Sequence, residues 1–330
     1  MHTTVPSHQL GTNMKGLKQF MFSLLMCCGT SAFAQPGVYM MNYGNMDNWV
    51  DRQVTESGLI GGEMKHVWAI GPTMTIEGDE AYFNKGGSPW ASSNVMAKVV
   101  GITKTNTSVF PEKRGNGYCA RLETRMEKVK VLGLINMEVL AAGSIFLGNV
   151  HEPIKGTKNP QKMLNSGIPF TQRPKALRFD YKVQMSTRKN RIKSTGFGSK
   201  DEIEGRDLHE VNLFLQKRWE DEEGNIYAKR VGTMVVRFDK DCDWQNDATF
   251  TILYGDITKD PSYDESMMGL NSIRYGVNSK GESVPIQEVG WAEADETPTH
   301  MQMQFTSSHG GAYIGSPGNI LWIDNVKLVY

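Results

Sequence analysis

Alternation of apolar and polar residues along most of the chain constrains its fold more than any other feature. The stretch KALRFDYKVQ (175–184) alternates four apolar residues with charged ones, and the same period recurs in EVNLFLQKRW (210–219), ATFTILYGD (248–256) and THMQMQFTSS (299–308). A period of two places like residues on one face of a strand. Because Gly, Pro and Asn residues separate these stretches, we predict an all-β fold, an antiparallel sandwich or barrel.

Few segments depart from this pattern. Residues 186–208 carry a basic and then an acidic run, and residues 277–298 are rich in Glu, Pro and Gly, so both are predicted as long loop excursions. Residues 262–276 predict at most one or two helical turns. No internal repeat or low-complexity linker divides the chain, which favours one large domain.

The segment MKGLKQFMFSLLMCCGTSAFAQ (14–35) has the pattern of a secretory signal peptide. Two lysines precede an apolar run from residue 20 to 28, and Ala32-Phe33-Ala34 matches the small-x-small cleavage pattern. We therefore predict that residues 1–34 are removed, with Met14 as the true start, and that residues 35–330 are exported. The destination is periplasmic, outer-surface or extracellular.

Two alternatives to cleavage are open. A transmembrane anchor needs roughly 20 apolar residues, more than this run offers, and the mature chain has no other such run. A lipoprotein is the second alternative, because Cys27 and Cys28 lie in the right region. Neither cysteine follows the small residue that lipidation prefers.

The charge balance argues against a nucleic-acid partner. The chain has 36 Lys and Arg and 36 Asp and Glu, so without Lys15 and Lys18 the acidic residues are in slight excess. A nucleic-acid groove needs a basic excess. Cys119 and Cys242 are the mature cysteines, and in an exported protein they either pair or stay as two free thiols.

Five pieces in order carry a family resemblance. They are GGSPWASSNVMAK (86–98), GNGYCARLETR (115–125), LAAGSIFLGNV (140–150), GIPFTQRPKALRFDYKV (167–183) and the terminal LWIDNVKLVY (321–330). In this order and spacing, from about residue 49 to 330, the chain resembles the bacterial putative carbohydrate metabolism domain family. The resemblance implies a jelly-roll β-sandwich, similar to galactose-binding-like modules, and export by glycan-degrading bacteria. It implies no settled activity.

Sugar recognition needs an aromatic face and planar polar side chains around it. Trp90 lies in a Gly/Ser/Pro-rich loop with Asn94 close by, and both are predicted ligand-binding residues; the alternative is that Trp90 plugs one end of the sandwich. Arg121 and Glu123 share one face of a predicted strand, opposite Leu122, and are further ligand candidates. The alternative for them is an exposed row of charges of little energetic value.

Asp324 is the anomaly of the last strand. Read in steps of two, Ile320 to Tyr330 is an apolar row apart from this carboxylate, and a buried charge is costly unless it is paired. The family resemblance implies a possible structural calcium here, with Asn45, Asp47 and Asn48 as companions. Two alternatives stay open. Asp324 is hydrogen-bonded to backbone or to an arginine, or the strand bulges at Asp324-Asn325 and Asp324 points to solvent.

Three functions are compatible with these features. The first is a secreted carbohydrate-binding protein that recognises a glycan. The second is a glycoside hydrolase or other glycan-active enzyme with a carboxylate pair. Its candidates are numerous and no pair is marked: Glu123, Asp180, Glu210, Asp256 and Glu288. The third is a non-catalytic surface or adhesion protein. His-rich zinc spacing is absent from the sequence.

Overall fold

The structure is a computed structural model that describes residues 37–83, 86–99, 101–131, 135–156, 158–196 and 200–330. The predicted signal peptide, residues 1–34, lies outside the described residues. Within the described ranges, no helix combines the length and apolar character needed to cross a membrane.

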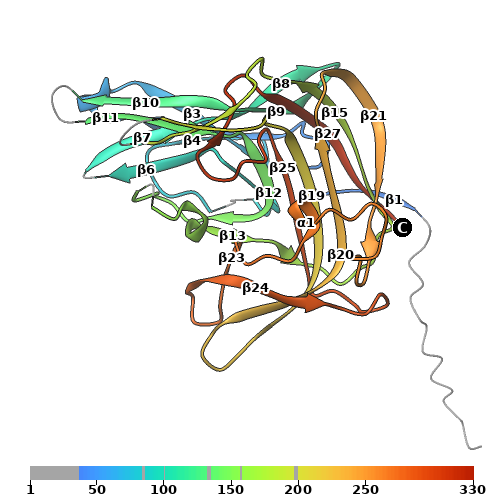
Figure 1. The fold of residues 1–330 in the computed structure, drawn as a ribbon. Helices are drawn as coiled ribbons and strands as arrows, with labels where there is room; N and C mark the ends of the chain where they lie inside the picture. Colours follow the sequence, from blue (N-terminus) through green and yellow to red (C-terminus); the bar gives the residue numbers. More distant parts are fainter. Residues whose placement is uncertain (1–36, 84–85, 100, 132–134, 157, 197–199) are drawn as a thin grey trace, which may run out of the picture. The chain divides into compact units, whose positions relative to one another are not determined.

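Two large sheets form the body of the fold, which is nearly all β as the sequence predicts (Figure 1). The six-stranded sheet has the order β21-β15-β27-β9-β8, with β1 beside β27. Its strands are β1 (Val38–Met40), β8 (Val109–Arg114), β9 (Gly117–Glu123), β15 (Ala176–Gln184), β21 (Cys242–Thr251) and β27 (Ile320–Val329).

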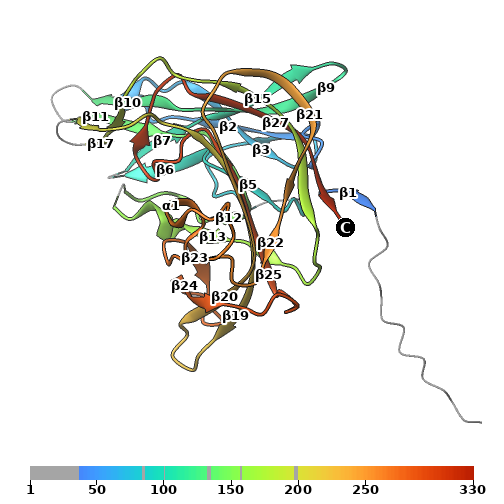
Figure 2. The same ribbon diagram turned by 45° about the vertical axis from the view of Figure 1, so that its right-hand side comes forward.

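The ten-stranded sheet has the order β13-β12-β25-β19-β20-β24-β23, with β5 on β12, β14 on β25 and β22 on β20. Its strands are β5 (Trp90–Ser92), β12 (Ser144–Val150), β13 (Leu164–Ser166), β14 (Ile168–Pro169), β19 (His209–Glu220), β20 (Ile226–Phe238), β22 (Leu253–Tyr254), β23 (Tyr275–Val277), β24 (Ser283–Trp291) and β25 (His300–Thr306). The long β19 and β20 cross the middle of the molecule in Figure 2.

The main core lies between these sheets. Leu177 and Phe179 of β15 pack in one apolar cluster with Leu213 of β19 and Phe305 of β25. Phe305 meets the ring of Phe179 edge-on, with the centroids 5.1 Å apart. Side chains of alternate residues on both sheets therefore fill a sandwich core, as the period of two requires.

Smaller elements complete the described chain. The sheet β3-β2-β4 and the hairpin β6-β7 lie with β10 and β11 at the left of Figure 1. These elements are β2 (Trp49–Thr55), β3 (Met64–Ile70), β4 (Met74–Glu77), β6 (Val95–Val99), β7 (Ile102–Asn106), β10 (Arg125–Val131), β11 (Ile135–Ala141), β16 (Arg191–Lys193), β17 (Thr195–Gly196), β18 (Asp201–Ile203), β26 (Ile314–Gly315), the 3-10 turns η1 (Gly58–Ile60) and η2 (Pro160–Met163), and the single-turn helix α1 (Glu265–Met268).

The structure corrects two predictions made from the sequence. Two strand pairs, β2–β4 and β20–β24, are parallel rather than antiparallel. Both predicted loop excursions contain strands, because β16 to β18 fall in residues 186–208 and β24 falls in 277–298. Of the two alternatives left open for the cysteines, the structure has the second, since Cys119 and Cys242 are both free thiols.

The last strand carries a β-bulge. Arg178 of β15 pairs with Lys327 and Asp180 pairs with Asp324, so β27 uses one residue more than β15 over this interval. Asn325 absorbs it with φ of 52°. An extra residue reverses which face each side chain takes. Ile323 before the bulge and Val326 after it are therefore both fully buried in the core. The predicted bulge is confirmed, and so is the packing of both halves of β27 on the core. The prediction that Asp324 points to solvent is wrong, because Asp324 is only 6% exposed.

Candidate functional site

An open polar pocket lies at this bulge, on the outer side of the six-stranded sheet. Its volume is ≈ 490 Å³, within the usual range of roughly 300–1,000 Å³ for small-molecule sites. Every lining residue except one glycine has a side chain that can form hydrogen bonds. The lining residues are Asn45, Asp47, Arg114, Asn116, Gly117, Tyr118, Asp324 and Asn325.

Three segments distant in sequence meet to form the pocket. β27 pairs with β9 only as far as Ile323 opposite Ala120. Beyond the bulge, β27 is hydrogen-bonded to the loop before β2 instead of to β9. The N–H of Val326 donates to the carbonyl of Gly44 at 2.8 Å. The gap between these two pairings places Asp324 and Asn325 in the wall of the pocket.

The β8–β9 hairpin supplies the opposite wall. Its two-residue turn begins with Gly115 at φ of 56°, which suits the first central position of a type II′ turn. Asp47 anchors the hairpin by accepting a hydrogen bond from the backbone N–H of Tyr118 at 2.9 Å. A Cβ at Gly117 would lie 2.0 Å from the Oδ1 of Asp47, so a side chain at this position would displace the Asp47 carboxylate that holds Tyr118.

Arg114 is the centre of the site. Its Nη1 donates to Oδ2 of Asp180 at 2.8 Å and also to Oδ2 of Asp324. Its Nη2 donates to Asn246, and its guanidinium stacks 3.8 Å above the ring of Trp244. One side chain thus links β8, β15, β21 and β27.

The two carboxylates have opposite pKa shifts. Burial raises the pKa of Asp324, and the nearby negative charge of Asp180 raises it further. The hydrogen bonds from Arg114 and from the Asn325 N–H lower this pKa, but not to its usual value. Burial also acts on Asp180, but hydrogen bonds from the Asp247 N–H, the Asn325 amide and Arg114 outweigh burial and lower its pKa.

These contacts bear on the interpretations of Asp324. Its carboxylate is held by Arg114 and by the Asn325 N–H, which matches the alternative of a paired, hydrogen-bonded aspartate. A guanidinium in contact with the carboxylate is unfavourable for a cation at the same place. Asn45 and Asp47 do line the same pocket, but no group of three or more His, Cys, Asp or Glu residues in the described ranges could hold a metal ion. The calcium site stays a prediction, and these contacts favour the paired aspartate.

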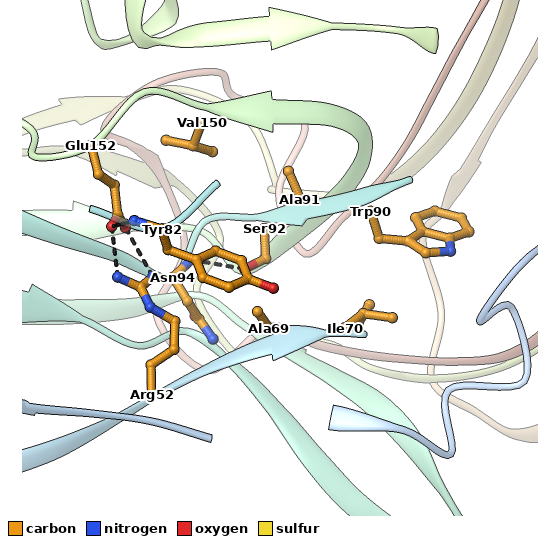
Figure 3. Close-up of a pocket in the computed structure, with 10 residues that line it drawn as sticks. All are labelled: Arg52, Ala69, Ile70, Tyr82, Trp90, Ala91, Ser92, Asn94, Val150 and Glu152. Atoms are coloured by element: carbon orange, nitrogen blue, oxygen red, sulfur yellow. Dashed lines mark hydrogen bonds and ion pairs between the residues drawn. The ribbon is translucent and has the colours of Figure 1, made fainter. Parts of the chain in front are cut away.

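Trp90 and Asn94 lie elsewhere, beside a small cavity of ≈ 20 Å³ (Figure 3). Such a volume suits about one water molecule and no sugar. Trp90 is 1% exposed, packs near Phe305 and donates its indole N–H to the carbonyl of Asn42. Asn94 is also buried and bridges the backbone of Trp68 and Val109. Neither side chain offers a surface to a glycan in this structure, so neither is carried into the proposed site.

Arg121 and Glu123 lie on the outer face of the six-stranded sheet, as expected from their alternation with Leu122. Arg121 pairs with Glu112 at 3.0 Å and with Glu123 at 2.8 Å, and it covers the ring of Phe110. Arg121 is opposite Trp322 on β27, two residues before Asp324. These two residues thus stay ligand candidates beside the pocket.

Four residues at or beside this pocket carry no distinguishing signal in the sequence: Arg114, Asn116, Tyr118 and Trp244. The only local signal was the Arg-Gly-Asn-Gly turn, which predicts a hairpin but no partner. Arg114 is 66 residues from Asp180 and 210 from Asp324, and no spacing rule connects positions so far apart.

The fold and pocket define an all-β sandwich with a polar ligand-sized site on one sheet. Residues 73–231 match the family model described as putative carbohydrate metabolism domain. This matched segment, just under half of the chain, contains Arg114, Asn116 and Tyr118, and Asp324 lies beyond it. No curated protein matches the chain.

Two solved structures are similar in outline. One is described as a putative glycoside hydrolase from Bacteroides thetaiotaomicron, with 19% identity, 82% of this chain and 76% of that chain covered, and a TM-score of 0.43. The other is described as a putative glycoside hydrolase from Bacteroides vulgatus, with 13% identity, 89% and 95% covered, and a TM-score of 0.40. At these TM-scores neither likeness bears on function.

Proposed function

We propose that this protein binds a glycan in the pocket at the β27 bulge. The observation that carries the proposal is the pocket itself, ≈ 490 Å³ in volume and lined almost wholly by Asn, Asp, Arg and Tyr side chains. Planar amides and carboxylates match the paired hydroxyls of a sugar ring, and a tyrosine ring offers C–H contact. The family name, which refers to carbohydrate metabolism, agrees with this chemistry.

A glycan longer than one sugar extends, in this proposal, along the outer face of the sheet toward Arg121 and Glu123. Both are half-buried rather than covered. Their ion pair fixes the guanidinium of Arg121 over Phe110, so little side-chain entropy is lost when a ligand binds there.

Asn116 gives the sharpest test of the pocket. It is exposed at the hairpin turn and lines the pocket, so replacing it removes a ligand contact without disturbing the core. We expect Asn116→Ala to weaken glycan binding about tenfold, the equivalent of one hydrogen bond of roughly 1.4 kcal/mol, with stability changed by less than about 0.5 kcal/mol. Titration calorimetry with glycans selected on an array measures both proteins.

The matched control is Gln287→Ala, which removes an amide from β24 of the other sheet. Its affinity should equal that of the unaltered protein. Equal affinity of the Asn116→Ala variant and the unaltered protein would contradict binding in this pocket, as would the absence of binding to any glycan on the array.

Glycoside hydrolysis is the second candidate, favoured by one observation. Asp180 and Asp324 contact the same nitrogen of Arg114, and their pKa values are shifted in opposite directions. Carboxylates with separated pKa values near one another can divide acid and base roles. However, Asp180 is 5% exposed and does not line the pocket, so it has little access to a substrate. This favours binding over catalysis.

The two functions are separated by measuring reducing ends released from the glycans that bind. A binding protein releases none above the buffer rate. Release that Asp324→Asn abolishes while binding persists would instead establish the hydrolase.

A further inference from the structure

The outer face of the ten-stranded sheet carries a second concentration of polar groups. Residues Val211, Leu213 and Leu215 of β19 point into the main core, so Asn212 and Gln216 point the other way. On β25, Gln302 and Gln304 share that outward face, since Met301 and Met303 are in the core. This face is on the opposite side of the sandwich from the pocket at the β27 bulge.

Four arginines and two glutamates meet on this face. Arg230 pairs with Glu288, and Arg237 pairs with Glu210 at 2.8 Å. Arg218 and Arg274 have no carboxylate partner among the described residues. Arg218 donates to the amide oxygen of Gln216 at 2.8 Å and to the carbonyl of Ser166 at 2.9 Å. Arg274 donates to the amide oxygens of Gln304 at 3.1 Å and Asn212 at 3.0 Å. In the described ranges, these two guanidinium groups thus have no carboxylate in direct contact.

Gln302 lies between these arginines. It is 2% exposed, and neither its amide nitrogen nor its amide oxygen has a hydrogen-bond partner among the described residues. Arg218 and Gln302 both lie against Gly167. A Cβ built on this glycine would be 2.7 Å from Nη2 of Arg218 and 3.2 Å from Cγ of Gln302.

On its other side, Gln302 pairs in register with Phe214, whose ring lies 5.6 Å from the guanidinium of Arg274. The Nε of Arg274 is also buried without a partner. Unpartnered buried donors are unfavourable, so the amide nitrogen of Gln302 and the Nε of Arg274 favour a ligand that accepts hydrogen bonds.

Electrostatics point in the same direction. Burial lowers the pKa of Arg218 to about 9, with the nearby charge of Arg274 opposing the favourable influence of Glu288. Burial also lowers the pKa of Arg274. Burial is the largest cause of both shifts, and the favourable influence of Glu210 and Glu288 on Arg274 does not offset it. A bound anion would supply the missing compensation.

We propose that Arg218, Gln302 and Arg274 form a second site, which binds the carboxylate of an acidic sugar such as a hexuronate. Planar guanidinium groups match a carboxylate in two-point contact, and the Gln302 amide supplies a further donor. The anionic part of the proposal is independent of the pocket at the β27 bulge. Only the assignment of the carboxylate to a sugar rests on the proposed glycan function.

The test is the rise in melting temperature of the full chain with glucuronate, galacturonate, glucose and glucose 6-sulfate, each over the same concentration range. A ligand that binds only the folded state raises the melting temperature with concentration. We expect a rise with the uronates and none with glucose. Equal effects of glucuronate and glucose, or none from any anion, would overturn the proposal. An equal rise with the sulfated sugar would overturn the preference for a planar carboxylate.

Arg274→Gln and Arg218→Gln assign the effect to this site. Each is expected to weaken uronate binding at least tenfold, while Arg178→Gln, on the six-stranded sheet, leaves it unchanged. Each variant also removes hydrogen bonds to neighbouring amide or carbonyl oxygens, so the melting temperature without ligand is measured separately from the uronate response. A lower melting temperature together with a full uronate response would identify a purely structural role. Asn116→Ala should keep the uronate response, which separates failure of this site from failure of the glycan pocket.

Discussion

Glu288→Ala is expected to lower the free energy of unfolding by about 3–5 kcal/mol, the usual cost of removing one partner of a buried ion pair. The side chains of Glu288 and Arg230 are 2% and 0% exposed. Glu288 also accepts hydrogen bonds from Gln216 at 2.6 Å and from the N–H of Asn271 at 3.0 Å. Alanine would leave the Arg230 charge and two further donors buried without a partner. Urea unfolding at pH 7 measures the loss.

The exposed pair of Lys217 and Glu296 is the control for this variant. Its side chains are 46% and 32% exposed, so Glu296→Ala should cost less than about 1 kcal/mol. Equal losses of unfolding free energy in Glu288→Ala and Glu296→Ala would contradict the argument that burial makes the Glu288–Arg230 pair important for stability.

The loss should also depend on pH. Burial alone would raise the pKa of Glu288, but the hydrogen bonds and charge of Arg230, with hydrogen bonds from Gln216 and Asn271, lower it below 4.5. A lowered pKa contributes stability that is present above pH 4.5 and lost as the pH falls through the pKa of the folded state. The difference between the unaltered protein and Glu288→Ala should therefore shrink in acid.

The sequence predicted the class of fold because alternation is a local property. Leu177 and Phe179 must share a face whatever their partners are, and the structure places both in the main core. The same local argument failed across β27. Reading Ile320, Trp322, Val326 and Leu328 as one face assumed an unbroken strand, and the extra residue at Asp324-Asn325 places the first two on the opposite face from the last two.

Trp90 shows a second limit of sequence reading. Its neighbours, Gly, Ser and Pro, are typical of exposed loops, yet the ring is buried near Phe305 and its N–H binds Asn42. Composition describes the backbone around a residue, whereas burial depends on contacts with distant segments. Asp324 was correctly recognised as a carboxylate in need of a partner, because that requirement is energetic. The identity of the partner, Arg114, depends on the three-dimensional meeting of β8 and β27.

Arg114→Ala is expected to have the broadest effect of any single change at the glycan pocket. The side chains of Asp180 and Asp324 are 7% and 9% exposed, and both depend on Arg114 for their positive partner. Without it, two neighbouring carboxylates are buried together, which should cost about 3 kcal/mol of unfolding free energy. Glycan binding should be lost as well, because Arg114 lines the pocket and fixes Asp324 in its wall. Denaturant unfolding and calorimetric titration measure the two effects.

Arg178→Ala is the matched control, since Arg178 lies on the same sheet and its side chain bonds only Thr249 in the described part of the chain. It should change stability by less than about 0.5 kcal/mol. Arg114→Lys should fall between the two variants, because an ammonium group keeps the charge but cannot reproduce the contacts of the planar guanidinium with Asp180, Asp324 and Asn246. Recovery of full stability and binding in Arg114→Lys would contradict a role for that geometry.

Acid should reverse part of the Arg114→Ala defect. In the unaltered protein the pKa of Asp180 is lowered, so its contribution to stability is present above pH 3.8 and is lost as the pH falls through its folded value. The raised pKa of Asp324 acts in the opposite sense and favours the folded state as this group is protonated. Without Arg114 both pKa values should rise, so the stability difference should narrow from pH 7 toward pH 4. Adding Asp324→Asn to Arg114→Ala should likewise recover part of the stability at pH 7, since it removes one of the two buried charges. A deficit that stays constant with pH and persists in the double variant would mean that lost packing on Trp244, rather than charge, explains the effect of Arg114.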